Sequence, residues 1–326
     1  MSRSRDVVLL LTHSGDYFTI DRVAAALERR GVQPFRLNTD QFPMTVQLTA
    51  QISGSELQYG IEQGGQAITA EQVRSVWLRR LWQPQLPETL APQFRSACLR
   101  ESWAALEGFL EHLQEARWLD HLEQVRDAEK KLRQLEIARS VGLRIPHTMV
   151  SNHPQQVRDF FAAVKGQMVT KLLTPLSYSM EGSAFFLYTS AVTAEDLQEA
   201  ESLRYCPMIF QEQIPKQREM RVVFVAGQLF VGSLDASRYA ATTLDWRRTN
   251  SGECPWQPGE LPPLVGDRLQ SLMAKLRLGF GAIDLIQTPA GDYVFLEVNP
   301  TGEWGMLERD LGYPIAEAIA DALLIE

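Results

Sequence analysis

The segment from residue 281 to residue 300 constrains the fold most strongly, because it carries the pattern of a strand pair. Two apolar runs flank the sequence Thr-Pro-Ala-Gly-Asp at residues 288–292. Proline presets the φ angle that a turn needs and glycine permits positive φ, so we expect the chain to reverse direction here. The pattern predicts an antiparallel β-hairpin.

Three polar side chains of this hairpin are expected to lie close together. A turn centred between residues 290 and 291 places Asp284 opposite Glu297. Asn299 follows two residues later and lies on the same face of its strand. Two facing carboxylates repel each other unless a cation lies between them. Carboxylate and amide oxygens suit Mg²⁺, which also accepts phosphate oxygens. The alternative is a hairpin whose acids are solvated on its outer face.

Three basic residues are candidates for binding the phosphate that accompanies such an ion. Lys171 interrupts an apolar strand, and Lys131 begins a helix. Arg221 opens an apolar run two residues after Glu219. Each has a simpler explanation, because strand lysines often protect an exposed edge and the other residues suit an ordinary surface. Singly, none of the three is specific.

The rest of the chain alternates strands and helices, as in an α/β protein. Residues 6–11 form an aliphatic strand, and residues 21–30 form a helix that stops at Gly31. The glycine pattern of a dinucleotide-binding domain is missing there. The helix expected at residues 193–203 is predicted to begin at a Thr193 cap, with Asp196 three residues later. Further strands are expected at residues 46–52, 73–81, 168–173 and 185–188, and further helices at 97–113, 129–141 and 193–203.

Composition and charge exclude several classes of protein. The aliphatic run at residues 7–11 is far shorter than the ~20 apolar residues that cross a bilayer. A net charge of −8 gives no electrostatic footprint for nucleic acid. The 3 cysteines are widely spaced, which argues against a disulfide framework or a zinc site and favours a reducing compartment. We therefore expect a cytoplasmic enzyme without nucleic-acid or membrane partners.

The order of the candidate residues resembles the ATP-grasp superfamily over residues 125–300. The resemblance implies that two lysines reach the phosphates of ATP, that a hinge after a strand holds adenine, and that two Mg²⁺ ions are bound. The implied ATP-binding residues are Lys131, Lys171, Gln211, Glu212, Gln213, Ile214 and Glu219. The implied metal ligands are Asp284, Glu297 and Asn299, and the implied catalytic residues are Arg221, Arg248 and Asn250.

One segment departs from the superfamily pattern. Members carry a glycine-rich loop between the second lysine and the hinge, whereas residues 172–183 contain a single glycine. The hydroxyl groups of Ser177, Ser179 and Ser183 are candidates to replace the backbone amides that cradle phosphate.

Longer segments resemble the microviridin-type graspetide ligases, and the similarity spans essentially the whole chain. These segments lie at residues 12–16, 76–84, 205–216, 245–248 and 297–314. The last is most similar to the lactam-forming branch of that family. The resemblance implies that ATP activates a Glu or Asp side chain of a ribosomal precursor peptide as an acyl phosphate, which a Lys amine then captures. The sister branch uses Ser or Thr hydroxyls and forms lactones.

The resemblance also implies a leader segment of the precursor that binds in the central domain. The matching region is an acidic helix with Glu195, Asp196 and Glu199, for which a solvated helix face is the alternative. An acidic face would favour a leader that contains arginine. Glu303, beside Trp304, is a candidate base for the attacking amine, and an ordinary surface acid is its alternative.

The implied architecture is an α/β (α+β) ATP-grasp fold in three parts. They are a Rossmann-like pre-ATP-grasp domain at residues 1–120, a central subdomain at 121–206 and a C-terminal subdomain with a mixed sheet and the metal site at 207–326. A homodimer follows from the habit of the family alone.

Two other functions stay open at this point. The chain could join free amino acids or add glutamate to a protein tail, as other ATP-grasp enzymes do. It could also be a binding module that uses ATP only as a switch. The presence of both lysines together with all three metal ligands argues against the switch, because a switch needs no complete metal site.

Overall fold

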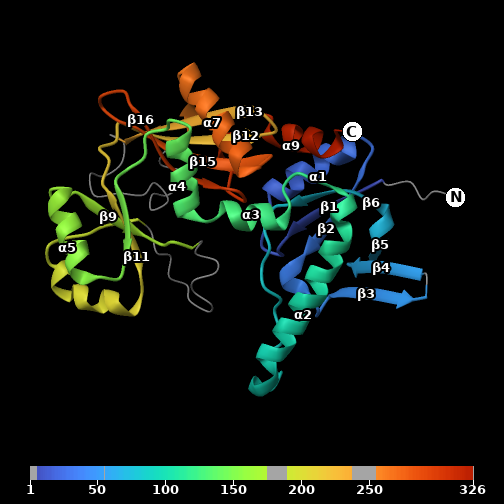
Figure 1. Ribbon diagram of the computed structural model, residues 1–326. Helices are drawn as coiled ribbons and strands as arrows, with labels where there is room; N and C mark the ends of the chain where they lie inside the picture. Colours follow the sequence, from blue (N-terminus) through green and yellow to red (C-terminus); the bar gives the residue numbers. More distant parts are fainter. Residues whose placement is uncertain (1–5, 55, 175–188, 237–254, 326) are drawn as a thin grey trace. The chain divides into compact units, whose positions relative to one another are not determined.

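The computed structural model describes residues 6–54, 56–174, 189–236 and 255–325. The chain divides into two compact units, which are described separately: Met1–Leu122 with Pro314–Glu326, and Glu123–Tyr313 (Figure 1). The expected division at residues 120 and 206 stays a prediction. No helix among the described residues is long and apolar enough to span a membrane.

The first unit is built on a small parallel sheet. Its central strand β1 (Val7–Thr12) consists of aliphatic residues and a threonine, and all six are buried. β1 pairs in parallel with β2 (Gln33–Asn38) and β6 (Val73–Leu78), and β7 (Arg117–Trp118) adds to β6. The strands expected at residues 6–11 and 73–81 are therefore confirmed.

Two helices pack against this sheet, although they come from opposite ends of the chain. α1 (Thr19–Arg29) begins two residues earlier than expected, and α9 (Ile315–Leu324) is almost entirely apolar. The Arg30 guanidinium donates to the carboxylates of Glu317 and Asp321, at 2.5 and 2.8 Å. These ion pairs and the buried face of α9 explain why the C-terminal residues belong to the first unit.

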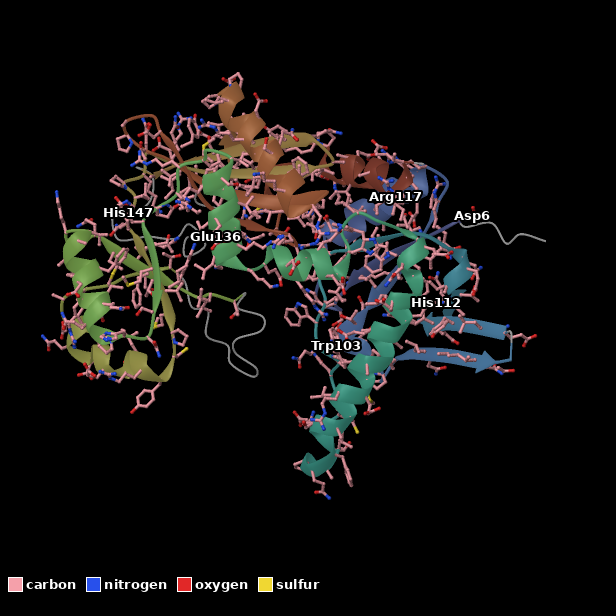
Figure 2. The ribbon with its side chains drawn as sticks, viewed as in Figure 1. Asp6, Trp103, His112, Arg117, Glu136 and His147 are labelled. Atoms are coloured by element: carbon pink, nitrogen blue, oxygen red, sulfur yellow. The ribbon has the colours of Figure 1, made fainter. Side chains whose placement is uncertain are left out.

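A second sheet and a long helix complete the first unit. β3 (Val46–Ser53), β4 (Glu56–Gln63) and β5 (Gln66–Thr69) form an antiparallel meander. The 3₁₀ turns η1 (Thr39–Gln41), η2 (Ala70–Gln72) and η3 (Leu113–Glu115) lie in the connections. The helix expected at residues 97–113 is α2 (Pro92–His112), which carries Trp103 and His112 (Figure 2). Among its residues, only Leu106, Phe109 and Leu110, in its second half, are buried. The prediction of a core-packed helix therefore holds for its second half.

The second unit begins with two helices and a four-stranded antiparallel sheet. The order of the strands is β10-β9-β11-β8. α5 and η4 cover this sheet with a small apolar cluster around Val157, Met168 and Phe210. The elements are α3 (Leu122–Ala128), α4 (Lys131–Ser140), β8 (Thr148–Ser151), α5 (Pro154–Ala163), β9 (Met168–Lys171), β10 (Ser190–Ala191), η4 (Asp196–Tyr205) and β11 (Met208–Glu212).

The helix expected at residues 193–203 is a 3₁₀ helix, η4, and begins at Asp196. Thr193 and Asp196 nevertheless exchange the expected hydrogen bonds, because the Thr193 amide donates to the Asp196 carboxylate at 2.8 Å and the Asp196 amide donates to the Thr193 hydroxyl at 3.2 Å. The Thr193–Asp196 hydrogen bonds are therefore present as expected, but Glu195 is the capping position and the helix begins three residues later than expected. The strand expected at residues 185–188 lies outside the described residues.

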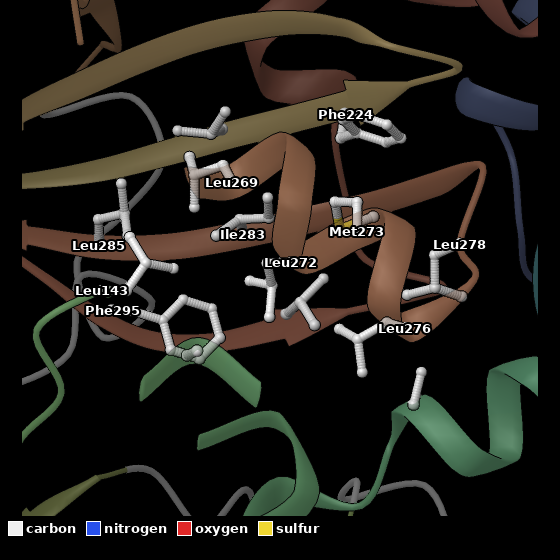
Figure 3. Packing of buried hydrophobic residues seen from close by; sticks show 14 of the residues in the cluster. Leu143, Phe224, Leu269, Leu272, Met273, Leu276, Leu278, Ile283, Leu285 and Phe295 are labelled. Atoms are coloured by element: carbon white, nitrogen blue, oxygen red, sulfur yellow. The ribbon is translucent and has the colours of Figure 1, made fainter. Parts of the chain in front are cut away.

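A five-stranded sheet with the order β14-β13-β12-β15-β16 forms the rest of the second unit. Its main cluster packs side chains of α4 and α7 against β12, β15 and β16, including Leu272, Ile283 and Phe295 (Figure 3). The elements are β12 (Arg218–Val225), β13 (Gln228–Asp235), β14 (Gln257–Pro258), α7 (Pro263–Leu276), β15 (Phe280–Gln287), β16 (Tyr293–Asn299) and α8 (Gly305–Leu311).

Candidate active site

The β15–β16 hairpin confirms the expected pairing of Asp284 with Glu297. The route to that pairing differs from the expectation. Gln287 pairs with Tyr293, so the turn is centred on Ala290, and Leu285 pairs with Phe295. A bulge at Leu296 then shifts the register by one residue, and the two carboxylates face each other beyond it.

Asn299 joins the two carboxylates, as the strand period predicts. Its Nδ2 lies 3.3 Å from Asp284 Oδ2 and 3.5 Å from Glu297 Oε1. A half turn of the amide would present its oxygen to a cation instead, because the two ends of an amide differ only in donor and acceptor. The three side chains thus supply oxygen ligands from one face of one hairpin.

Both lysines reach this cluster. Lys131 Nζ lies 2.9 Å and Lys171 Nζ 3.5 Å from Glu297 Oε2. Lys171 is not an exposed edge lysine, because β9 lies between β10 and β11 and only 12% of its side chain is exposed. Burial lowers the pKa of the Lys171 ammonium; Glu297 opposes this shift, and Lys131 adds to it.

Arg221 also contacts the hairpin and is buried rather than on the surface. β12 pairs with β15 so that Arg221 lies opposite Asp284, and its Nη1 is 3.1 Å from Asp284 Oδ1. Glu219 forms its ion pair with Lys216. The structure therefore gathers three cations and two carboxylates, contributed by α4, β9, β12, β15 and β16.

The expected adenine hinge follows β11 and is ordered by its own contacts. The Gln211 side chain is buried and donates to Thr148 Oγ1 at 2.9 Å. The amides of Glu212 and Gln213 donate to the His147 and Gln167 carbonyls, both at 2.9 Å. The Ile214 side chain packs in an apolar cluster, and its amide forms no hydrogen bond to another described residue.

The candidate peptide-binding acids have different surroundings. Glu195, Asp196 and Glu199 are exposed, and the bonds from Thr193 lower the pKa of Asp196. The Glu303 carboxylate accepts from the amides of Trp304 and Gly305, at 3.2 and 3.0 Å, and so caps the start of α8. Arg248 and Asn250, like Ser177, Ser179 and Ser183, lie outside the described residues.

Sequence reasoning missed two residues that support the cluster. Gln134 contacts the strand that carries Glu297 and Asn299. Gly302 lies three residues after Asn299 and has no room for a side chain. A Cβ atom at Gly302 would overlap the Cβ atom of Ala282 and lie 2.9 Å from the Cβ atom of Asn299. The sequence feature that could have identified Gln134 is its position three residues after Lys131, which places both on one face of the same helix.

We expect Gly302→Ala to destabilise the protein by about 1–3 kcal/mol, because the added methyl group has no room. Urea unfolding measures this change. Gly266→Ala is the matched control, because Gly266 lies within the helix α7 and the new Cβ would lie 3.7 Å from Leu229 Cδ1, an ordinary contact distance. This substitution is expected to stabilise the protein by about 0.5–1 kcal/mol. Equal effects of the two substitutions would contradict the packing argument.

Comparisons with known proteins agree with this geometry. The family model for the MvdD pre-ATP grasp domain matches residues 7–126. Macrocyclase MdnB from Microcystis aeruginosa MRC has 56% sequence identity and a TM-score of 0.85, over 98% of this chain and 100% of its own. Macrocyclase MdnC of the same organism, solved with its precursor peptide MdnA, has 36% identity and a TM-score of 0.86, over 98% and 99%.

A RiPP-associated ATP-grasp ligase from Chryseobacterium gregarium, solved with ADP and with a leader and core peptide, has 29% identity and a TM-score of 0.88, over 98% of this chain and 96% of its own. No curated protein matches the chain. Fold and site together define an ATP-dependent ligase with the ATP-grasp fold. The chain belongs to the family of ATP-grasp macrocyclases that includes MdnB and MdnC.

Proposed function

We propose that this ligase closes rings in a ribosomal precursor peptide by joining Glu or Asp carboxylates to Lys amines. The observation that carries the proposal is the cluster of Lys131, Lys171 and Arg221 around two facing carboxylates. The peptide complexes of the relatives support a peptide substrate. Their similarity does not distinguish lactam from lactone formation.

The donor set of the hairpin fits Mg²⁺. Asp284, Glu297 and Asn299 lie on one face of the hairpin, and carboxylate and amide oxygens are ligands that suit this ion. No group of three or more His, Cys, Asp or Glu side chains in the described ranges could hold a metal ion. The amide of Asn299 and the phosphate oxygens would therefore complete the coordination. A second ion stays a prediction.

The residues of the cluster suit phosphoryl transfer to a carboxylate. A peptide carboxylate oxygen attacks the γ-phosphorus, ADP leaves, and an acyl phosphate forms; a deprotonated amine then attacks the carbonyl carbon and expels phosphate. Bound Mg²⁺ would neutralise phosphate charge. Lys131 and Lys171 would then contact phosphate oxygens, while Arg221 keeps Asp284 in place. The Ile214 amide would donate to the adenine edge.

Intact mass spectrometry of a candidate precursor peptide incubated with the protein, ATP and Mg²⁺ tests the function. Each ring formed by condensation through an acyl phosphate removes one water, about 18 Da. Fragmentation that maps the links to Glu–Lys pairs supports lactams, whereas links to Ser or Thr identify the lactone branch. A mass gain of one residue would identify an amino-acid ligase, and ATP binding without ADP release would identify a switch.

The acidic surface of η4 gives a test of leader binding. Glu195→Lys with Glu199→Lys is expected to weaken an arginine-containing leader by about 0.2–1 kcal/mol per exposed pair, and to leave ATP binding unchanged. This pair of substitutions spares the Thr193–Asp196 cap. Fluorescence polarisation of a labelled leader measures the affinity. Glu56→Lys with Glu62→Lys, on exposed positions of β4, controls for the change in net charge.

A further inference from the structure

Gln134 is a buried polar residue of α4 that the proposed chemistry does not use. It is 2% exposed, and its helix neighbours Leu135 and Ala138 belong to the main apolar cluster. A buried amide among apolar side chains is costly unless its hydrogen bonds are satisfied. The hydrogen bonds of Gln134 therefore show which groups require a glutamine at this position.

The Gln134 side chain bonds to both backbone groups of Val298. Its Nε2 donates to the Val298 carbonyl at 2.7 Å, and its Oε1 accepts from the Val298 amide at 2.9 Å. The second Nε2 hydrogen is donated to the Ala128 carbonyl at 2.6 Å. These three bonds fix the orientation of the amide, because the reverse orientation would set its oxygen against two carbonyl oxygens.

Val298 lies between Glu297 and Asn299 on β16, which is the last strand of its sheet. The backbone groups of Val298 that face away from β15 have no neighbouring strand, and the Gln134 side chain forms the hydrogen bonds that such a strand would supply. Farther along the same edge, the Phe295 amide donates to the Arg144 carbonyl at 2.8 Å. The edge of β16 is thus held on both sides of the bulge that sets the position of Glu297.

The same contacts set the position of Lys131. Ala128 is the last residue of α3, and Lys131 is the first of α4. Lys131 and Gln134 are three residues apart and share one helix face, so Gln134 binds β16 while Lys131 contacts the neighbouring Glu297.

We propose that Gln134 is a positioning residue that holds Glu297, Asn299 and Lys131 in the geometry needed to bind Mg²⁺ and nucleotide. The proposal rests on the proposed function, since it takes Glu297 and Asn299 as metal ligands. Removing a group that holds the metal ligands in place without touching the metal commonly lowers the metal affinity by about 10–100-fold.

Gln134→Met tests this role, because methionine keeps the length and the helix preference of the side chain but lacks the amide. We expect Mg²⁺ titrated into the ADP-saturated protein to bind about 10–100-fold more weakly by calorimetry. We also expect the Val298 amide to exchange faster with deuterium. Gln134→Asn, whose amide reaches less far, is expected to weaken binding in the same direction and serves if the methionine variant does not fold.

Leu135→Ala is the matched control from the same helix. It opens a cavity in the apolar cluster without touching β16 polar groups, so it should lower thermal stability and leave the Mg²⁺ affinity unchanged. Equal weakening by both variants, or wild-type affinity in Gln134→Met, would overturn the positioning role alone. A wild-type protein that binds no Mg²⁺ with ADP would overturn the proposed function and this inference together.

Discussion

Replacing Glu297 by Gln and Asn299 by Ala together is expected to abolish both ADP release and ring formation. The change removes one of the two facing carboxylates and the amide that joins them. It also removes the charge that both lysines contact. We expect a loss of at least about 100-fold in rate, since groups that stabilise transition-state charge are commonly worth that much. A coupled assay for ADP, with and without peptide, measures it.

Asp292→Asn provides the control within the same hairpin. Asp292 pairs with Arg144 at 2.6 Å, but about half of each side chain is exposed. Exposed pairs contribute about 0.2–1 kcal/mol to stability, so this variant should retain full activity. A folded Glu297→Gln, Asn299→Ala protein that still turns over at the wild-type rate would refute the assignment of the site.

Lys171→Met is expected to separate activity from stability. Burial lowers the pKa of Lys171, which means that the folded protein disfavours its charged form. An apolar side chain of similar length removes that penalty, while Lys131 still pairs with Glu297. The free energy of unfolding should therefore stay the same or rise. The rate of ADP release should fall by about 10²–10³-fold, because a cation facing the phosphates is lost.

Lys130→Met is the control for this substitution. Lys130 precedes Lys131 in the chain, but 65% of its side chain is exposed and it pairs with Asp127. Its replacement should leave the rate of ADP release unchanged. A folded Lys171→Met protein with wild-type activity would show that the phosphate-binding role of Lys171 is wrong, and a marked loss of stability would contradict the argument from burial.

The local elements were predictable because their signals are short-range. Aliphatic runs mark β1 and β6, and the Thr-Pro-Ala-Gly-Asp turn marks the β15–β16 hairpin. The pairing of Asp284 with Glu297 was predicted correctly, but for an incomplete reason, because the bulge at Leu296 shifts the strands. A bulge depends on packing on both sides of a strand, which no pattern within one strand records.

The partners of charged residues were less predictable. An ordinary surface position was the alternative for Arg221, but the structure buries this residue and pairs it with Asp284 on the adjacent strand. An exposed edge was the alternative position for Lys171, but its strand lies between two others. The helix η4 begins three residues later than expected, although the predicted Thr193–Asp196 hydrogen bonds are present.

The amino-acid sequence by itself determined the chemistry that this chain carries: two lysines, an arginine and three oxygen ligands in the order of an ATP-grasp ligase. It also determined the hairpin on which those ligands lie, since turn chemistry and strand period act between near neighbours. Only the tertiary structure decided that Lys171 is buried and that Gln134 holds the edge of β16. Burial and edge contacts join residues more than a hundred positions apart, so no local pattern encodes them.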